Sequence, residues 1–408
     1  MKESVFEQSL RFHETNQGKI ELRSKVRIKT KEELSLAYTP GVAEPCLRIH
    51  SNSEDAYRYT SKGNFVAVVS DGSSVLGLGD IGALAAIPVM EGKAMICKVF
   101  GGVDAFPVCL DTKDTEEIIN IIKNIAPVFG AINLEDIGAP KCFEIETRLK
   151  KLLDIPVFHD DQHATATVVL AGLINALKVA GKKFEEIRVV IIGAGAAGSA
   201  TAKILTGEGV RNILVCDSKG IIHKGRTGLN PYKEELADIT NRNNEQGTLS
   251  YAMRGADVFI GLSVGGAVSE DMVRSMADDA IAFPLANPTP EIMPDMAKRA
   301  GSCIVATGRS DYPNQVNNAL AFPGMFRGAL DVRAREINEE MKLAAAFALA
   351  SLVPEPSKDH IIPGIFDPEV APSVAFAVAK AAMESGVARL RMEPGKVAEH
   401  TRELVKLQ

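Results

Sequence analysis

Hydrophobic and polar positions alternate in blocks after a mostly polar first segment. Residues 1–60 carry few apolar runs, which predicts helices and irregular structure there. Short apolar runs bounded by Gly, Asp or Pro then predict strands at residues 65–70, 94–99, 106–110, 131–134 and 156–158. Between two of them, apolar residues from Ile118 to Ile125 recur at helical spacing behind Asp114, a favourable helix N-cap. Strands that alternate with helices indicate a parallel sheet covered by helices.

A long apolar helix expected over residues 161–180 leads into a second alternating unit. Its apolar runs predict strands at residues 187–192, 213–216, 257–260, 280–285 and 303–306. Ala-rich stretches at 325–350 and 372–390 predict helices that pack back across both units. We therefore predict an α/β fold with an N-terminal parallel-sheet domain (1–160) and a C-terminal Rossmann-type dinucleotide-binding domain with terminal helices (161–408).

Composition and charge exclude several classes of function. Hydrophobic residues make up 46% and charged residues 24% of the 408 residues, as in ordinary globular proteins. The net charge of −6 is spread along the chain without a basic block, which disfavours nucleic-acid binding. The N-terminus lacks the apolar core of a secretory signal, and the longest apolar stretch, residues 343–353, is too short to cross a bilayer. The six cysteines stand apart with no CxxC pair, so we expect a reduced, cytoplasmic protein with no membrane partner.

A glycine pattern after the first strand of the second unit predicts a dinucleotide site. Gly193, Gly195 and Gly198 follow the apolar strand and open a helix. Ala196 and Ala197 complete the turn. The first glycine permits a tight turn, the second lets the pyrophosphate reach the helix N-terminus, and the third permits close helix–strand packing. A glycine-rich structural turn would show the same residues, but the complete strand–turn–helix frame favours the nucleotide.

Asp217, at the end of the next strand, bears on the choice of cofactor. Its carboxylate is placed to accept a hydrogen bond from the adenosine ribose 2′-hydroxyl and would repel a 2′-phosphate, which favours NAD. Lys219, Lys224 and Arg226 follow closely and are able to receive that phosphate, so NADP stays open. Asn287, in a loop after a late strand, is a candidate for the nicotinamide-ribose edge or a substrate carboxylate, although Asn-Pro is also a turn signal.

Two pairs of adjacent carboxylates, Glu135-Asp136 and Asp160-Asp161, precede the glycine pattern. Each pair follows a predicted strand, and ligand sites of open α/β sheets collect at such strand ends. Hard oxygen ligands suit Mg²⁺ or Mn²⁺, so four acids beside a hydride acceptor predict a metal-assisted oxidoreductase. These acids could instead be solvated side chains or, for Asp161, the N-cap of the following helix.

Lys93 and Tyr38 are candidates for proton transfer. Lys93 begins the apolar run at 94–99, where desolvation would lower the pKa of its ammonium group into a useful range. Tyr38 precedes a Thr-Pro-Gly turn that would hold its ring. Taken alone, a surface lysine and a packed tyrosine are the commoner interpretations of these residue types.

Together these residues resemble the malic enzymes, in particular the short prokaryotic type. The resemblance runs from about residue 20 to about residue 390. It is carried by motifs at residues 38–46, 71–72 with 76–82, 91–93, 134–136, 159–161, 287–289, 317–318 and 322–324. The resemblance implies oxidative decarboxylation of (S)-malate to pyruvate and CO₂, with NAD or NADP as the hydride acceptor and with Mg²⁺ or Mn²⁺.

The resemblance also implies a role for each candidate. It assigns three metal ligands, Glu135, Asp136 and Asp161. Lys93 would take the malate hydroxyl proton, and Asp160 would partner Lys93 and tune its pKa. Tyr38 would protonate C3 of enolpyruvate. Asn287 and Asn318 would bind malate.

One position departs from the longer malic enzymes, which carry an arginine for a malate carboxylate where this chain has Ser74. The resemblance to short members of the family also implies a dimer in which Tyr38 comes from the neighbouring subunit, so we expect a homodimer. A malolactic enzyme, which makes lactate from malate without releasing NADH, would use nearly the same residues. An amino-acid dehydrogenase could share the two-domain layout but would not need the four acids. A non-enzymatic NAD-binding sensor would bind the nucleotide without turnover.

Overall fold

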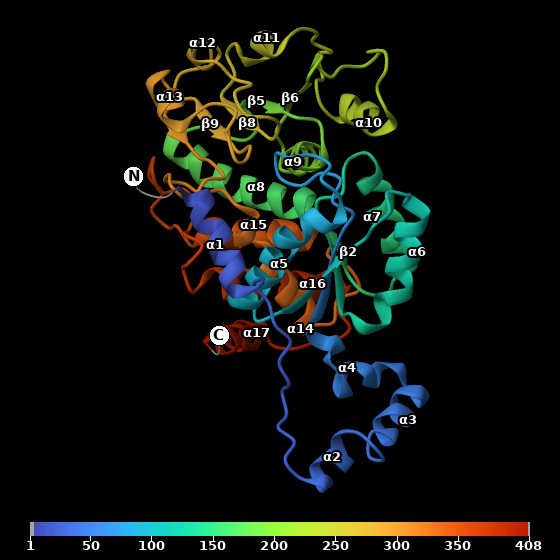
Figure 1. The fold of residues 1–408 in the computed structure, drawn as a ribbon. Coiled ribbons are helices and arrows are strands. Elements are labelled where there is room, and N and C mark those ends of the chain that lie inside the picture. The colour runs from blue at the N-terminus through green and yellow to red at the C-terminus, as the bar shows by residue number, and fades with distance from the viewer. Residues whose placement is uncertain (1–3, 407–408) are drawn as a thin grey trace.

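Two parallel β-sheets organise the chain, whose computed structural model describes residues 4–406 (Figure 1). The first sheet has the strand order β2-β1-β3-β4. Its parallel strands are β1 (Phe65–Ser70), β2 (Asp104–Cys109), β3 (Ala131–Leu134) and β4 (Val157–His159). The strands predicted at 65–70, 106–110, 131–134 and 156–158 are therefore confirmed, with ends that shift by one or two residues.

The strand predicted at 94–99 is wrong, because this segment belongs to helix α5 (Gly82–Gly101). Buried residues recur along α5 every three or four positions, at Ala83, Ala86, Met90, Ala94, Cys97 and Gly101. That spacing is helical, but the continuous apolar run hid it, since a short buried strand and a buried helix segment look alike in sequence. Lys93 therefore lies inside a helix.

The second sheet has the order β10-β9-β8-β5-β6-β7. Its strands are β5 (Arg188–Ile192), β6 (Asn212–Asp217), β7 (Gly220–Ile221), β8 (Val258–Gly261), β9 (Ile281–Pro284) and β10 (Ile304–Val305). All pair in parallel except the short β7, which the sequence did not predict. The chain reverses direction across the sheet at β5, and ligands of doubly wound sheets bind at such a switch point.

Helices connect and cover these strands. In the first unit they are α6 (Thr115–Ile125) and α7 (Lys141–Leu152), and α6 begins behind Asp114, whose side chain accepts from the backbone N–H of Glu117 as predicted. In the second unit they are α9 (Ala196–Gly207), α10 (Pro231–Ile239), α11 (Leu249–Met253), α12 (Glu270–Arg274) and α13 (Pro294–Arg299). Short 3-10 helices occur at Ser53–Asp55, Ser61–Asn64, Ala126–Val128 and Asn318–Leu320.

Helix α8 (Asp160–Ala180) joins the two units through the middle of the molecule (Figure 1). Within residues 4–406 it alone is long and apolar enough to span a membrane, but 67% of that window is buried inside the protein. Its apolar residues are part of the main hydrophobic core, which also includes Phe158, Val189 and Phe326. Its composition is therefore that of a core helix packed on all sides.

Four C-terminal helices pack back against the rest of the chain, and the sequence predicted all of them except the last. They are α14 (Phe322–Asp331), α15 (Glu339–Ser351), α16 (Val370–Glu384) and α17 (Pro394–Lys406). Helices α14, α16 and α17 contact α5 of the first unit, and α15 contacts α8. They therefore share one core with both sheets.

The N-terminal arm, residues 20–60, differs from everything else. After α1 (Val5–Asn16), it carries α2 (Lys31–Ala37), α3 (Ala43–Ser51) and α4 (Ala56–Tyr59). None of the described residues from 4 to 65 is buried. In Figure 1 the blue helices α2 and α3 project away from both sheets. The arm thus has no core of its own within one chain.

Candidate active site

The two carboxylate pairs meet at one edge of the first sheet. Strands β3 and β4 pair in parallel with Leu134 beside His159, so both pairs follow directly after neighbouring strand ends. The backbone N–H of Asp136 donates to Asp161 Oδ2 at 2.8 Å. The expectation that these acids converge at the carboxyl ends of two strands is confirmed.

Lys93 reaches this cluster from helix α5. Its Nζ lies 2.5 Å from Asp160 Oδ2 and 3.0 Å from Glu135 Oε1. The side chain of Lys93 is 13% exposed, and that of Asp160 is fully buried. Asn318 donates from Nδ2 to the same Asp160 Oδ2 at 2.5 Å. The structure thus joins a lysine, two acids and one of the two predicted amides in a single buried group.

The acids fit a divalent cation. One carboxylate oxygen each of Glu135, Asp160 and Asp161 lies within 4.8 Å of the others. Asp136 is not in that group, but its buried Oδ2 has no hydrogen-bond partner among the described residues. The same holds for Asp160 Oδ1. Buried carboxylate oxygens without donors carry a desolvation cost that a bound cation would remove.

Asp161 is not the cap of helix α8. The N-cap position is His159, without a side-chain capping bond, and α8 begins at Asp160. Asp161 lies inside the first turn, where its carboxylate accepts from Asp136 N–H instead. The capping interpretation is wrong because the helix begins one residue earlier than predicted.

The charges of the cluster shift the pKa values of its members. Burial, with the charge of Asp161, raises the pKa of Asp136 to about 8. Burial also raises the pKa of Glu135 well above its ordinary value. For Lys93, burial acts to lower the pKa, but the charges of Asp160 and Glu135 raise it well above its usual range. The predicted direction for Lys93 is therefore wrong, because its neighbours outweigh its burial.

Tyr38 does not join this group within one chain. It follows α2 in the N-terminal arm and is 66% exposed. The arm projects away from the sheets, whereas Lys93 lies in the body on α5 (Figure 1). The two residues predicted to move protons are therefore separated in the described chain.

Asn287 lies on an exposed loop after β9 that touches both units. The backbone of Gly77, in the loop that leads into α5, packs so closely that a Cβ there would lie 2.5 Å from the Asn287 carbonyl oxygen. On the other side, a Cβ at Gly308 would lie 2.7 Å from Asn287 Nδ2. The loop thus contacts both the first unit, at Gly77, and the segment that follows the last strand of the second sheet, at Gly308.

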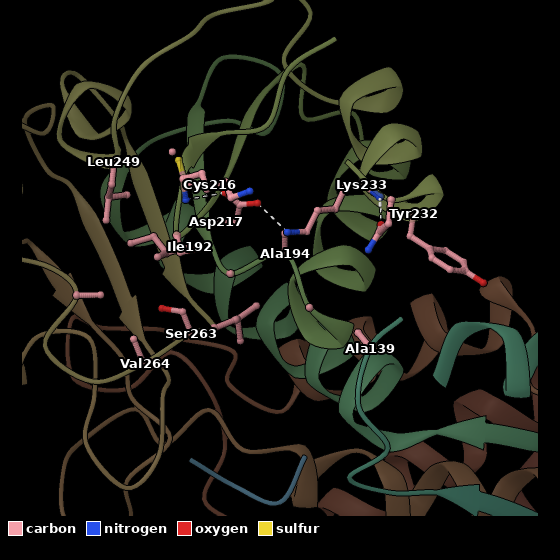
Figure 2. Close-up of a pocket in the computed structure, with 18 of the residues that line it drawn as sticks. Ala139, Ile192, Ala194, Cys216, Asp217, Tyr232, Lys233, Leu249, Ser263 and Val264 are labelled. Carbon is pink, nitrogen blue, oxygen red and sulfur yellow. Dashed lines mark hydrogen bonds and ion pairs between the residues drawn. The ribbon is translucent and has the colours of Figure 1, made fainter. Parts of the chain in front are cut away.

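A cavity of about 740 Å³ lies over the carboxyl ends of β5 and β6 (Figure 2). Gly193 and Gly195 line it, and Ala196, Ala197 and Gly198 form the first turn of α9 behind them. Gly193 has a φ of 111°, and a Cβ at Gly198 would lie 1.9 Å from the Gly193 carbonyl oxygen. The N-cap of α9 has no side-chain bond, so free N–H groups face the cavity, as a pyrophosphate requires.

Asp217 at the rim of this cavity is already paired. Its Oδ2 accepts from Lys233 at 2.7 Å (Figure 2). The same oxygen accepts from Arg226, and Oδ1 accepts from Lys219 N–H at 2.9 Å. Burial acts to raise the pKa of Asp217, but these hydrogen bonds lower it to about 2. Two cations offset its charge, so Asp217 alone does not exclude a 2′-phosphate. The sequence missed Lys233, because it lies on α10, outside the strand–turn–helix motif.

A second group, around His163, supports the first turn of α8, and the sequence missed its partners Glu146 and Lys342. His163 Nε2 lies 2.7 Å from Glu146 on α7, and Gln162 Nε2 donates to the same carboxylate at 3.1 Å. The Nζ atom of Lys342, on α15, lies 3.2 Å from His163 Nδ1. These buried polar contacts fix the turn that carries Asp160 and Asp161. No local motif marks them, because the partners come from three helices.

Each of the two units matches a known protein domain family. The chain matches the malic enzyme N-terminal domain over residues 17–150 and the malic enzyme NAD-binding domain over residues 163–383. It is 59% identical over 404 residues to the bifunctional malic/malolactic enzyme of Bacillus subtilis, with 98% of each chain covered. It is 60% identical over 374 residues to the NAD-dependent malic enzyme of Geobacillus stearothermophilus, which covers 91% of this chain and 78% of that one.

A solved structure agrees over nearly the whole chain. The crystal structure of malic enzyme from Pyrococcus horikoshii superposes with a TM-score of 0.95 at 53% identity. The match covers 99% of this chain and 96% of that chain. Both sheets and the helices between them are therefore shared with that protein.

Proposed function

The chain belongs to the malic enzyme family of NAD- or NADP-dependent oxidoreductases, and we propose that it converts (S)-malate to pyruvate and CO₂ through the residues gathered at Lys93. The observation that carries the proposal is the buried contact of Lys93 with Asp160 and Glu135. The loop that begins at Glu135 continues to Ala139, which lines the nucleotide cavity. The proposed base, the set of acids and the cavity proposed for the hydride acceptor thus adjoin one another.

Lys93 is the proposed base for the oxidation. Its Nζ takes the proton of the malate hydroxyl while hydride leaves C2 for the nicotinamide ring. Asp160, at 2.5 Å, holds Nζ in place and balances its charge. Asn318 fixes Asp160 in turn and, with Asn287, supplies amide donors for a substrate carboxylate. These four residues orient the substrate and move the first proton.

The carboxylates are proposed to hold a divalent cation through Glu135, Asp136 and Asp161, with Asp160 adjacent. When bound, Mg²⁺ or Mn²⁺ would polarise the substrate oxygen and offset the carboxylate charge that raises the pKa of Lys93. Burial of Glu135, Asp136 and Asp160 keeps bulk water away from this part of the site.

Tyr38 is the proposed acid for the second half of the reaction. When CO₂ leaves, the electrons of the broken C–C bond form the double bond of enolpyruvate, and the C2 oxygen takes back the proton held by Lys93. The Tyr38 hydroxyl then supplies the proton for C3 as the enol oxygen returns its proton to Lys93. Because Tyr38 lies in the arm, we propose a homodimer in which each arm completes the partner's site. Exposed apolar residues of the arm, such as Leu36 and Leu47, would be covered by that contact.

Three further assignments remain proposals. We place the boundary between the domains at residues 160–161, where β4 ends and α8 begins. We propose a cytoplasmic location. The paired state of Asp217 supports use of NADP as well as NAD, so the preference for NAD predicted from Asp217 is weaker than the sequence suggested.

A malolactic activity is the second candidate, because the Bacillus subtilis relative is named a bifunctional malic/malolactic enzyme. Such an activity would retain the reduced cofactor and transfer the hydride to pyruvate. It requires no residue beyond those already placed.

Steady-state kinetics with (S)-malate test the proposal, with NAD or NADP and with Mg²⁺ or Mn²⁺. We expect reduced nicotinamide and pyruvate in equal amounts, and loss of turnover with a metal chelator. Lactate without accumulation of reduced nicotinamide would instead assign the malolactic activity. Absence of turnover with either nucleotide and either metal would contradict both.

A further inference from the structure

Malate carries two carboxylates, and the described site has an excess of negative charge. Four acids lie at this site, and Lys93 is the one lysine or arginine paired with any of them among the residues described. Ser74 stands where longer malic enzymes have an arginine. On the proposed function, a cation besides Lys93 and the metal is therefore needed to bind the carboxylate that is farther from the reacting hydroxyl.

Arg309 lies where the two amide-bearing loops meet. Its Nη1 donates to the carbonyl oxygen of Pro288, directly after Asn287, at 3.2 Å. The carbonyl of nearby Thr307 accepts from Val316 N–H at 2.9 Å, which ties this segment to the one that carries Asn318. Arg309 is thus held next to the loop of Asn287, and its own segment is bonded to the one that leads to Asn318.

The guanidinium already binds a carboxylate in a two-point geometry. Arg309 Nε and Nη2 donate to the two oxygens of Asp311 at 2.9 and 2.7 Å. Asp311 is 56% exposed, and exposed ion pairs contribute little free energy. Replacement of Asp311 by another carboxylate would therefore cost little and would keep the same paired hydrogen bonds.

Two other cations near the strand ends of the first unit, Lys141 and Lys113, are less suited to bind the distal carboxylate of malate. Lys141 is paired with Asp71, which is fully buried, and removal of Lys141 would leave an unpaired buried charge. Lys113 donates to the carbonyl of Asp71 at 2.6 Å and to Asp80 at 2.7 Å. Lys113, like Arg309, is held by one exposed acid and one carbonyl, but its ammonium group lacks the planar fork with which a guanidinium binds a carboxylate at two points.

We propose that Arg309 releases Asp311 and binds the distal carboxylate of malate, which makes it the residue that selects four-carbon dicarboxylates. The inference rests on the proposed function and extends it to substrate selection. A 2-hydroxymonocarboxylate such as (S)-lactate would not use this contact.

The test compares Arg309→Gln with the wild-type chain. We expect the KM for malate and the inhibition constant of succinate to rise by about tenfold or more, as for loss of a hydrogen-bonded charge. The inhibition constant of (S)-lactate and the KM for the nucleotide should change by less than about twofold. Arg309→Lys keeps the charge but not the fork, so it should recover part of the loss. Arg274→Gln, on the surface of α12, is the matched control and should change none of these constants.

Asp311→Asn should act in the opposite direction to Arg309→Gln and should not raise the KM for malate. It removes the competing carboxylate, so the KM for malate should fall or stay level while Arg309 remains in place.

An unchanged malate KM in Arg309→Gln would overturn the inference. So would equal weakening of succinate and lactate, which would assign Arg309 to the shared carboxylate or to the loop alone. A change confined to the nucleotide KM would place Arg309 at the cofactor. If the wild-type chain does not oxidise malate, the proposed function itself fails, and that result is distinct from all of these.

Discussion

The buried catalytic centre and the N-terminal arm show opposite ways of placing a proton-transfer group. Lys93 lies on a 20-residue helix, and its acidic neighbours are held by strand ends, amides and a buried polar network. Tyr38 lies on a segment without a single buried residue among those described. In the proposed mechanism both groups serve one reaction, yet only Lys93 is set in place by the fold of one chain.

The contrast teaches that the two proton transfers depend on different contacts. The proposed base, Lys93, is positioned by the core before substrate arrives. The proposed acid, Tyr38, would be positioned only by association with a second chain. A variant of Lys93 should therefore stop the reaction at its first step, and a variant of Tyr38 at a later one.

Lys93→Ala should give the largest effect. Loss of the base should slow the formation of reduced nicotinamide in the first turnover by roughly three to four orders of magnitude. Stopped-flow absorbance with malate and Mn²⁺ measures this step directly. Lys98→Ala is the matched control, because Lys98 lies on the same helix and pairs with Asp104 at 2.8 Å at the surface.

A folding defect in Lys93→Ala would be visible as a lowered thermal midpoint, and partial rescue by a small primary amine would separate chemistry from folding. First-turnover oxidation at the wild-type rate in a folded Lys93→Ala protein would contradict the role of Lys93.

Tyr38→Phe should show the next largest effect, but at a different step. Pyruvate formation in the steady state should fall by roughly two to three orders of magnitude, while hydride transfer in the first turnover stays near the wild-type rate. Rapid-quench measurement of pyruvate beside stopped-flow absorbance separates the two. Equal slowing of both steps would mean that Tyr38 serves the oxidation or the fold instead.

A mixture of the two inactive variants tests whether Tyr38 acts at the site of the partner chain. If Tyr38 acts across the dimer, subunit exchange between Lys93→Ala and Tyr38→Phe creates mixed dimers with one complete site. Random exchange in equal amounts should restore about a quarter of wild-type activity. If each chain supplies both residues to its own site, the mixture stays inactive.

The sequence predicted most of the fold because its strands are short apolar runs that end at Gly, Pro or acidic residues. It failed at 94–99, where a buried helix and a buried strand have the same composition. The acids were found because strand ends collect ligands. The direction of the Lys93 pKa was not, because the sequence named Asp160 as a partner but did not show that Asp160 and Glu135 together outweigh the burial of Lys93. Lys233 was missed because its contact with Asp217 exists only after folding.

Asp161→Asn should have a smaller effect, confined to the metal. Removal of one carboxylate charge should raise the Mn²⁺ concentration for half-maximal activity by roughly ten- to a hundredfold. Mn²⁺ should raise the thermal midpoint of the wild-type chain by mass action, and this shift should shrink in the variant. Asp154→Asn, at an exposed acid after α7, is the control. An unchanged Mn²⁺ shift in Asp161→Asn would remove Asp161 from the metal site.

Lys233→Gln should have the smallest effect and extends the comparison to a charge of intermediate exposure. Lys233 shares Asp217 with Arg226, so its loss leaves Asp217 paired and the fold intact, but removes one cation from the rim of the nucleotide cavity. We expect kcat/KM with NADP to fall by several-fold and that with NAD to change little, because only NADP brings a 2′-phosphate. Lys203→Gln, whose lysine pairs with Glu235 at 2.8 Å, should leave the ratio unchanged. Equal loss with both nucleotides would mean that Lys233 only braces Asp217, and that this rim, unlike Lys93, does not use its charge for selection.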